Sequence, residues 1–126
     1  MARARRVVTG LLRRWGLAAE VPDFELAVSE LVSNALVHGA GRVHFRLSCD
    51  QGARVRLEVG DEGRDGTRPH LAERRTGGWG LRFVDQVAES WGAERGGEGT
   101  LVWMVKRAAR GGGVGDARAL RVVSPA

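Results

Sequence analysis

Three polar side chains are spaced along one predicted helix in a way that suits a binding or catalytic site. Glu30, Asn34 and His38 follow one another at intervals of four residues. Each interval turns only about 40° around a helix axis, so the three side chains form one stripe. Asn34 is the only asparagine of the chain and stands mid-helix, where asparagine is a poor helix former. A carboxylate and an amide one turn apart suit a site, and the alternative is an ordinary solvated helix face.

The helix that carries this stripe is predicted over residues 23–38, because its apolar residues recur at helical spacing. Asp23 is the expected N-cap, and Gly39 and Gly41 supply the stop. Residues 2–17 predict an earlier amphipathic helix with arginines opposite its apolar positions. The segment Gly77-Gly78-Trp79-Gly80 opens a third helix, whose apolar positions are Leu81, Phe83, Val84, Val87 and Ala88.

The remaining periodic segments alternate with a period of two and predict strands. Residues 42–49 and 54–59 alternate across a glycine-bearing turn and predict an antiparallel hairpin with one solvated face, with Cys49 buried and His44 outward. Residues 91–95 predict a short strand, and the apolar run 100–105 predicts a covered one. Helices gathered on one face of a mostly antiparallel sheet, an α+β two-layer sandwich, is the natural architecture for this order.

The composition limits the classes of protein to which this chain can belong. With 126 residues, 43% hydrophobic and 28% charged, the chain is expected to form one globular domain over residues 1–107, followed by a flexible Gly- and Arg-containing tail over 108–126. No apolar run approaches the ~20 residues of a membrane span, and the basic start lacks a signal-peptide apolar core, so a cytoplasmic location without a membrane partner is expected. The net charge of +5 is concentrated at the two ends, which leaves nucleic-acid binding as a remote alternative.

Four motifs occur in a fixed order along the chain: Glu30 with Asn34, Asp61 with Gly63, Gly78 with Gly80, and Gly99 with Thr100. In this order they resemble the ATP-binding domain of the histidine kinase-like (GHKL) ATPase superfamily, which includes DNA gyrase B, histidine kinases and MutL. The phrase Glu30-Leu31-Val32-Ser33-Asn34-Ala35 and the block 77–91 are most similar to the small anti-sigma-factor serine/threonine kinases of actinobacteria. The resemblance covers most of residues 1–107 and implies a Bergerat-type fold with about three helices on one face of the sheet.

The resemblance also implies a role for each residue in binding Mg-ATP. Asn34 is the expected Mg²⁺ ligand, through its amide oxygen, and Glu30 is the expected catalytic residue, which orients or deprotonates the attacking hydroxyl or water. Asp61 is expected to accept a hydrogen bond from the adenine amine, with Gly63 leaving room for the base. The other expected nucleotide contacts are Gly78, Gly80 and Leu81 at a helix start, where phosphates bind, and Thr100. If each motif is considered alone, the alternative for the glycines is an ordinary turn, and the alternative for Asp61 is an Asx-turn at a strand end.

The sequence departs from the family pattern at two places, and both bear on the predicted function. The family pattern has a second glycine two residues after the position of Gly63, whereas the next glycine of this chain is one residue later, at Gly66. The chain also begins inside the first helix, which predicts a sheet edge that is missing or supplied by a partner. By resemblance, the protein is a kinase for a serine or threonine on a small anti-anti-sigma (STAS-type) partner and sequesters a sigma factor, with a homodimer possible. A non-catalytic ATP-dependent interaction switch is the alternative.

Overall fold

The computed structural model describes residues 2–38, 41–51, 53–62, 79–96, 99–109 and 118–124. Its helices are α1 (Ala2–Arg14), α2 (Val21–His38) and α3 (Trp79–Val87), with a 3₁₀ turn η1 (Ala18–Glu20) before α2. Its strands are β1 (Val43–Cys49), β2 (Arg54–Asp61), β3 (Ser90–Gly96), β4 (Gly99–Arg107) and β5 (Arg118–Ser124). None of the helices in these described ranges is long and apolar enough to cross a membrane.

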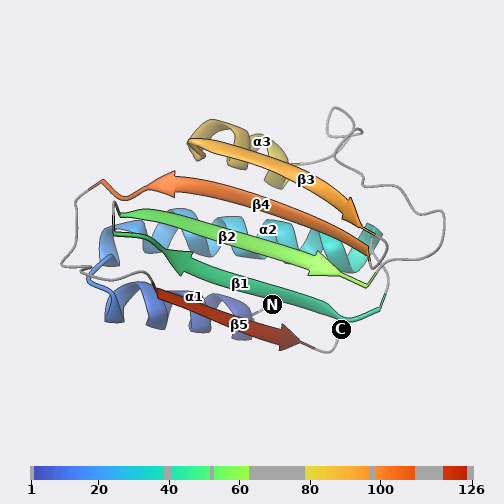
Figure 1. Cartoon of the computed structure of the whole chain (residues 1–126), viewed down its shortest axis with the longest axis horizontal. Helices are drawn as coiled ribbons and strands as arrows, with labels where there is room; N and C mark the ends of the chain where they lie inside the picture. The colour runs from blue at the N-terminus through green and yellow to red at the C-terminus, as the bar shows by residue number, and fades with distance from the viewer. Residues whose placement is uncertain are drawn as a thin grey trace.

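The strands form one antiparallel sheet in the order β3-β4-β2-β1-β5, and the helices lie together on one of its faces (Figure 1). Helix α2 lies between α1 and α3 and packs against both. This arrangement confirms the predicted α+β two-layer sandwich. The predicted hairpin of β1 and β2 is confirmed as well, with Cys49 buried.

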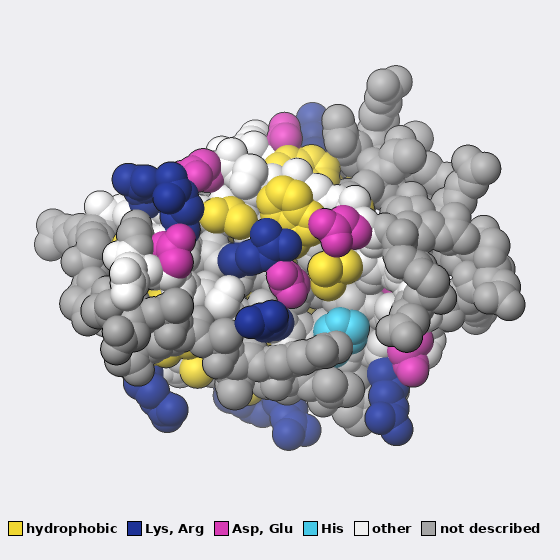
Figure 2. Space-filling view, viewed as in Figure 1, with side chains coloured by type: hydrophobic (Ala, Val, Ile, Leu, Met, Phe, Trp, Pro, Cys, Tyr) yellow, Lys and Arg dark blue, Asp and Glu magenta, His cyan; other side chains and the backbone are white. Residues whose placement is uncertain are grey.

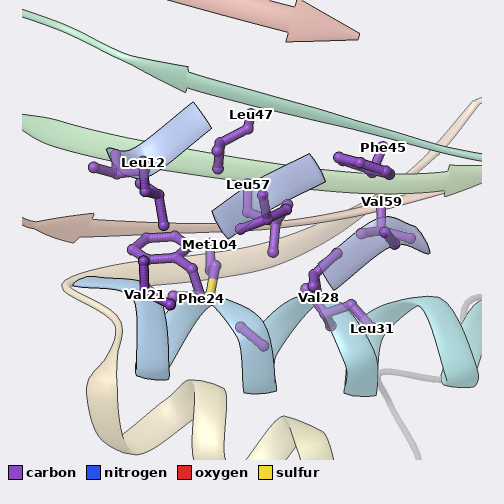
Figure 3. Close-up of a cluster of buried hydrophobic side chains, with 14 of the residues drawn as sticks. Leu12, Val21, Phe24, Val28, Leu31, Phe45, Leu47, Leu57, Val59 and Met104 are labelled. Atoms are coloured by element: carbon purple, nitrogen blue, oxygen red, sulfur yellow. The ribbon is translucent and has the colours of Figure 1, made fainter. Parts of the chain in front are cut away.

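The core lies between the helical layer and the sheet (Figure 3). Phe24 and Val28 of α2 point toward Phe45 and Leu57 of the sheet, and Leu12 of α1 joins the same cluster. Each of these five side chains has less than 2% of its surface exposed. Complete burial of one such side chain stabilises the fold by roughly 1.5–3 kcal/mol, so this contact fixes how α2 lies on the sheet.

The start of α2 differs from the prediction. The helix begins at Val21, directly after η1, so Asp23 lies within its first turn and the expected N-cap is wrong. Pro22 is tolerated there because the first turn leaves its N–H positions without helical partners. Asp23 instead lies near Lys106 of β4, with 3.5 Å between Oδ2 and Nζ.

A buried ion pair joins this helix junction to the end of β4. Glu20 is only 2% exposed, and its carboxylate accepts hydrogen bonds from Lys106 Nζ and from the backbone N–H of Ala109, the latter at 2.9 Å. A buried carboxylate is costly unless it is paired and hydrogen-bonded. These contacts of Glu20 therefore connect the helical layer to the sheet.

One face of the sheet has none of the three described helices over it, and we call it the open face (Figure 2). The sequence predicted a covered strand over residues 100–105, but helices cover only one side of β4. Val102 and Met104 face the helical layer, because they pair with the core residues Val59 and Leu57. The alternate β4 residues Leu101, Trp103 and Val105 lie on the open face and are only half-buried.

The C-terminal segment also differs from the prediction. Residues 118–124, expected to belong to a flexible tail, form β5 and pair with β1 along its whole length, from Cys49↔Arg118 to Val43↔Ser124. The sequence predicted a sheet edge that is missing or supplied by a partner, and in the structure the edge beside β1 is occupied by β5, a strand from the other end of the chain. A short extended segment can pair with an open strand edge through its backbone alone. The glycine-rich sequence before residue 118 gave no indication of such a segment.

Candidate functional site

Glu30 and Asn34 lie on the flank of α2 that faces α3. The opposite flank is identified by Glu25, whose carboxylate accepts a 2.6 Å hydrogen bond from the Thr9 hydroxyl of α1. Asn34 comes nine residues after Glu25, which at about 100° per residue places it on the other side of the helix axis. Both Glu30 and Asn34 are half-buried. The predicted stripe therefore runs along the junction of α2 with α3; the side chain of His38 lies outside the described residues.

Asp61 and Thr100 meet at the ends of two neighbouring strands. The last printed pair of the β2–β4 ladder is Gly60↔Leu101, and Asp61 and Thr100 occupy the next positions on their strands. Asp61 alternates with Val59 and Leu57, so its side chain is on the helix-facing side of the sheet, where it is 7% exposed. Thr100 shares that side, because directly opposite residues of an antiparallel pair point to the same face.

Gly99 permits this close approach. Its φ of +123° is rare for residues with a side chain, and a Cβ at this position would lie 2.0 Å from the backbone oxygen of Asp61. Only glycine can bring the beginning of β4 this near to the end of β2. The spacing of Asp61 and Thr100 therefore depends on Gly99.

Glu62 is a contact of this region that the sequence analysis did not identify. Its Oε1 accepts a 2.6 Å hydrogen bond from the backbone N–H of Arg42, and it approaches Gly41, where a Cβ would lie 2.5 Å away. Gly41 has a φ of +75°, which favours glycine. The carboxylate thus ties the end of β2 to the segment that follows α2. An acidic residue beside Asp61 was visible in the sequence, but its backbone partner became apparent only from the strand register.

The start of α3 lies toward the same end of the sheet. The C-terminal end of α3 is fixed at the far end, where Glu89 N–H donates to Val105 O at 2.7 Å, so the helix begins nearer to Gly99 and Asp61 (Figure 1). Gly80 belongs to its first turn, and Leu81 is buried in the core at 4% exposure. Gly63, Gly78 and Gly66 lie outside the described residues.

The structure thus places Asp61 beside Thr100 at one end of the sheet, toward which α3 begins, and places Glu30 and Asn34 on the flank of α2 that faces α3. These residues supply carboxylates, a neutral amide and a hydroxyl, and the start of α3 supplies backbone N–H groups. Carboxylate and hydroxyl groups can hydrogen-bond a base, and helix N–H groups favour anions. An amide oxygen is a hard ligand suited to Mg²⁺ and adds no negative charge beside phosphates. The arrangement suits a nucleotide with its metal ion.

Comparison with known proteins supports this assignment. A sequence model of the histidine kinase-like ATPase domain matches residues 1–106. No curated protein matches the chain. Among solved structures, the histidine kinase domain of a blue-light activated histidine kinase from Erythrobacter litoralis is similar, with 30% identity and a TM-score of 0.59 over 73% of this chain. A longer structure of that histidine kinase gives 28% identity and the same TM-score.

The matched proteins are longer than this chain, which covers 46% of the first structure and 31% of the second. The match to the family extends over nearly all of the elements that form the helical layer and the sheet. Only β5 lies beyond the matched residues. The fold and the sequence match agree, and the chain belongs to the family of histidine kinase-like ATPase domains.

Proposed function

We propose that this protein binds Mg-ATP between α2, α3 and the Asp61 end of the sheet and acts as a regulatory serine/threonine kinase. Its substrate is a hydroxyl on a small anti-anti-sigma (STAS-type) partner, and its second partner is a sigma factor. The single observation that supports the nucleotide site is buried Asp61 opposite Thr100 at the strand ends, beneath a helical layer in which α2, the helix that carries Asn34, packs on both β2 and α3. The kinase role rests on Glu30 and on the resemblance to anti-sigma-factor kinases.

Each residue has one task in this proposal. Asp61 accepts a hydrogen bond from the adenine amine, and Thr100 contacts the base beside it. The N–H groups at the start of α3 hold phosphate oxygens. Asn34 is the protein ligand of Mg²⁺, which would neutralise charge on the phosphates when bound.

The transfer step uses Glu30 as the base. The partner hydroxyl oxygen attacks the γ-phosphorus, and the bond from that phosphorus to the β,γ-bridging oxygen breaks, so ADP leaves. The hydroxyl proton passes to the Glu30 carboxylate. Glu30 precedes Asn34 by one helical turn on the same flank, which puts a base beside the metal ligand.

Titration with Mg-ATP, followed by isothermal calorimetry, tests the nucleotide site. Asn34→Ala should weaken binding by about 1–3 kcal/mol, roughly fivefold to 150-fold, because one metal ligand is lost. Ser33→Ala is the matched control, since Ser33 is the exposed neighbour in the same helical turn. Equal affinity of the Asn34→Ala variant and the wild type would contradict the proposal.

Phosphoryl transfer is tested separately with Glu30→Gln. The variant should keep its affinity for Mg-ATP and lose transfer of labelled phosphate to STAS-type partner proteins, because the neutral amide cannot accept the hydroxyl proton. The position of Gly66, one residue later than in the family pattern, favours the second candidate, a non-catalytic ATP-dependent switch. Normal nucleotide binding without any transfer by the wild type would select the switch.

A further inference from the structure

Asp61 is held in place by a strand that supplies none of the predicted nucleotide contacts. It pairs with Val43 of β1 in the antiparallel ladder, so β1 is its neighbour on one side. Val43 is part of the core, with 3% of its surface exposed, and has no polar side-chain group. The further contacts of β1 are with the residues directly before and after Asp61.

The residue after Asp61 is anchored through its side chain and its backbone. Glu62 accepts the 2.6 Å hydrogen bond from the N–H of Arg42, directly before β1 begins at Val43. Its carbonyl carbon also lies against Gly99, where an added Cβ would be 2.6 Å away. Glu62 is therefore fixed to the start of β1 on one side and to the start of β4 on the other.

The residue before Asp61 is anchored by the ring of His44. His44 is on the open face, because it alternates with the core residues Val43 and Phe45, and it lies directly opposite Gly60. A Cβ added to Gly60 would be 2.7 Å from Nε2 of the imidazole and 2.8 Å from Cε1. Such distances are well inside the about 3.5–4.0 Å of ordinary carbon contacts. The half-buried imidazole therefore occupies the space that a side chain at residue 60 would fill.

Strand β4 reaches the same position from the other side. Leu101 pairs with Gly60, and its Cδ1 would lie 3.2 Å from the same added Cβ. His44 and Leu101 thus converge above Gly60 from the two strands that flank β2. Gly60 directly precedes Asp61, and Leu101 directly follows Thr100. The packing on the open face is therefore one residue away from both of the expected contacts with the base.

Glycine beside a binding residue makes such packing necessary. Glycine has more backbone freedom than any other residue, so Gly60 by itself would let the end of β2 adopt several conformations. A binding site that is disordered before its ligand arrives loses affinity, because binding must then order it. The imidazole restricts Gly60 without adding a side chain to it. Asp61 can therefore be ordered before a nucleotide binds.

We propose that His44 is a positioning residue of the nucleotide site and sets the preference of that site for adenine. Its ring packs on Gly60 from the open face and fixes the Asp61 carboxylate on the opposite, helix-facing side of the sheet. His44 acts through the backbone of β2 and does not touch the nucleotide. The inference rests on the proposed function, in which Asp61 accepts a hydrogen bond from the adenine amine.

Calorimetric titration with two nucleotides tests this role. Purine riboside triphosphate is ATP without the exocyclic amine, so the ratio of the two affinities measures recognition of that amine. His44→Ala should lower the affinity for Mg-ATP by roughly two- to tenfold, the cost of ordering one more group on binding, and leave the analogue nearly unaffected. A general loss of structure would weaken both nucleotides equally. His44→Phe, which keeps a flat ring over Gly60, should restore the preference for ATP.

Ser48→Ala is the matched control. Ser48 lies on the same face of β1, opposite Arg56, at the end of the strand away from Asp61. Its replacement should leave the preference for ATP unchanged. Urea unfolding checks that each variant is folded.

Gly60→Ala tests the same contact from β2. Gly60 is not among the residues with positive φ, so its backbone accepts alanine and the added Cβ meets the ring of His44. This variant should lower the preference for ATP, and it carries the test if His44→Ala does not fold. The double variant should recover part of the loss, because the new methyl group fills the space that the imidazole leaves. Additive losses would contradict the contact.

The possible failures of this inference and of the proposed function are distinguishable. A wild type that binds no Mg-ATP overturns the proposed function and this inference with it. If Asp61→Asn abolishes the preference for ATP while His44→Ala keeps it, only the role of His44 is overturned. Failure of His44→Phe to restore the preference also overturns that role. A wild type that binds ATP and the analogue equally overturns recognition of the amine, and with it the role of His44.

Discussion

Replacing Gly99 with alanine should lower both the stability of the fold and the affinity of the candidate site for nucleotide, because both depend on the close approach of β2 and β4. Gly99 has a φ of +123°, and an added Cβ would lie 2.0 Å from Asp61 O and 2.6 Å from the carbonyl carbon of Glu62. Both contacts are with backbone, which cannot rotate away as a side chain can. The beginning of β4 must therefore move away from the end of β2.

The expected cost follows from two terms. A residue with a side chain held in a sparsely populated φ/ψ region costs about 1–3 kcal/mol of stability. The overlap of the new Cβ with the backbone of β2 also forces the strand ends apart, which lowers the stability further. We expect Gly99→Ala to lower the free energy of unfolding by about 3 kcal/mol, a large part of the 5–15 kcal/mol typical of a domain. Because Thr100 moves with Gly99, the affinity for Mg-ATP should fall as well.

Urea unfolding of the wild type and variant measures the first effect, and calorimetric titration the second. Gly10→Ala is the matched control, because a Cβ at Gly10 of α1 would meet nothing within 4 Å. In that helix interior alanine should stabilise the protein by about 1 kcal/mol. A Gly99→Ala protein within about 0.5 kcal/mol of the wild type, the range of neutral surface changes, would refute the close approach of β2 and β4.

Three further changes test other parts of the structure. Lys106→Met should cost about 3 kcal/mol in urea unfolding, because it leaves the buried Glu20 carboxylate without its cation; adding Glu20→Gln, which keeps an acceptor for Ala109 N–H, should recover part of this loss, and additive effects would contradict the coupling. Gly92→Ala should push the Trp103 ring away from β3 and lower the free energy of unfolding in urea by about 1–3 kcal/mol, because an added Cβ would lie 3.0 Å from Cζ2 of the indole; an unchanged stability would mean that the ring can shift without cost. Asp61→Asn should reduce the affinity for ATP more than for GTP in calorimetry, since only adenine presents an exocyclic amine at that position; an equal loss for both nucleotides would argue against base recognition by Asp61.

The helices and the first hairpin were predictable because local patterns determine them. The apolar spacing of α1 and α2 and the alternation of β1 and β2 indicate which side of each element is buried, whatever their neighbours are. The end of α2 at His38 was also predictable from the glycines that follow it, of which Gly41 has a positive φ of 75°. The start of α2 was not, because η1 continues into the helix at Val21 and takes the place of a cap at Asp23.

The residue types of the candidate site were predicted from motifs, whereas its geometry could not be predicted from the sequence. Asn34, Asp61 and Thr100 were recognised from motifs, but the sequence contains no measure of how near they lie. The strand register places Thr100 beside Asp61, the contact of Thr9 with Glu25 turns Asn34 toward α3, and the hydrogen bond from Arg42 to Glu62 fixes the adjoining segment. Each of these depends on partners that are distant along the chain.

The sequence by itself determined the helices, the alternating strands and the chemical groups of the site, because these depend on neighbours a few residues apart. Only the tertiary structure decided which side of β4 the helices cover and that residues 118–124 pair with β1. Long-range pairing is decided by which edges and faces remain unoccupied after the local elements have formed. The same reason explains why the half-buried row of Leu101, Trp103 and Val105 on the open face could be recognised only in the folded protein.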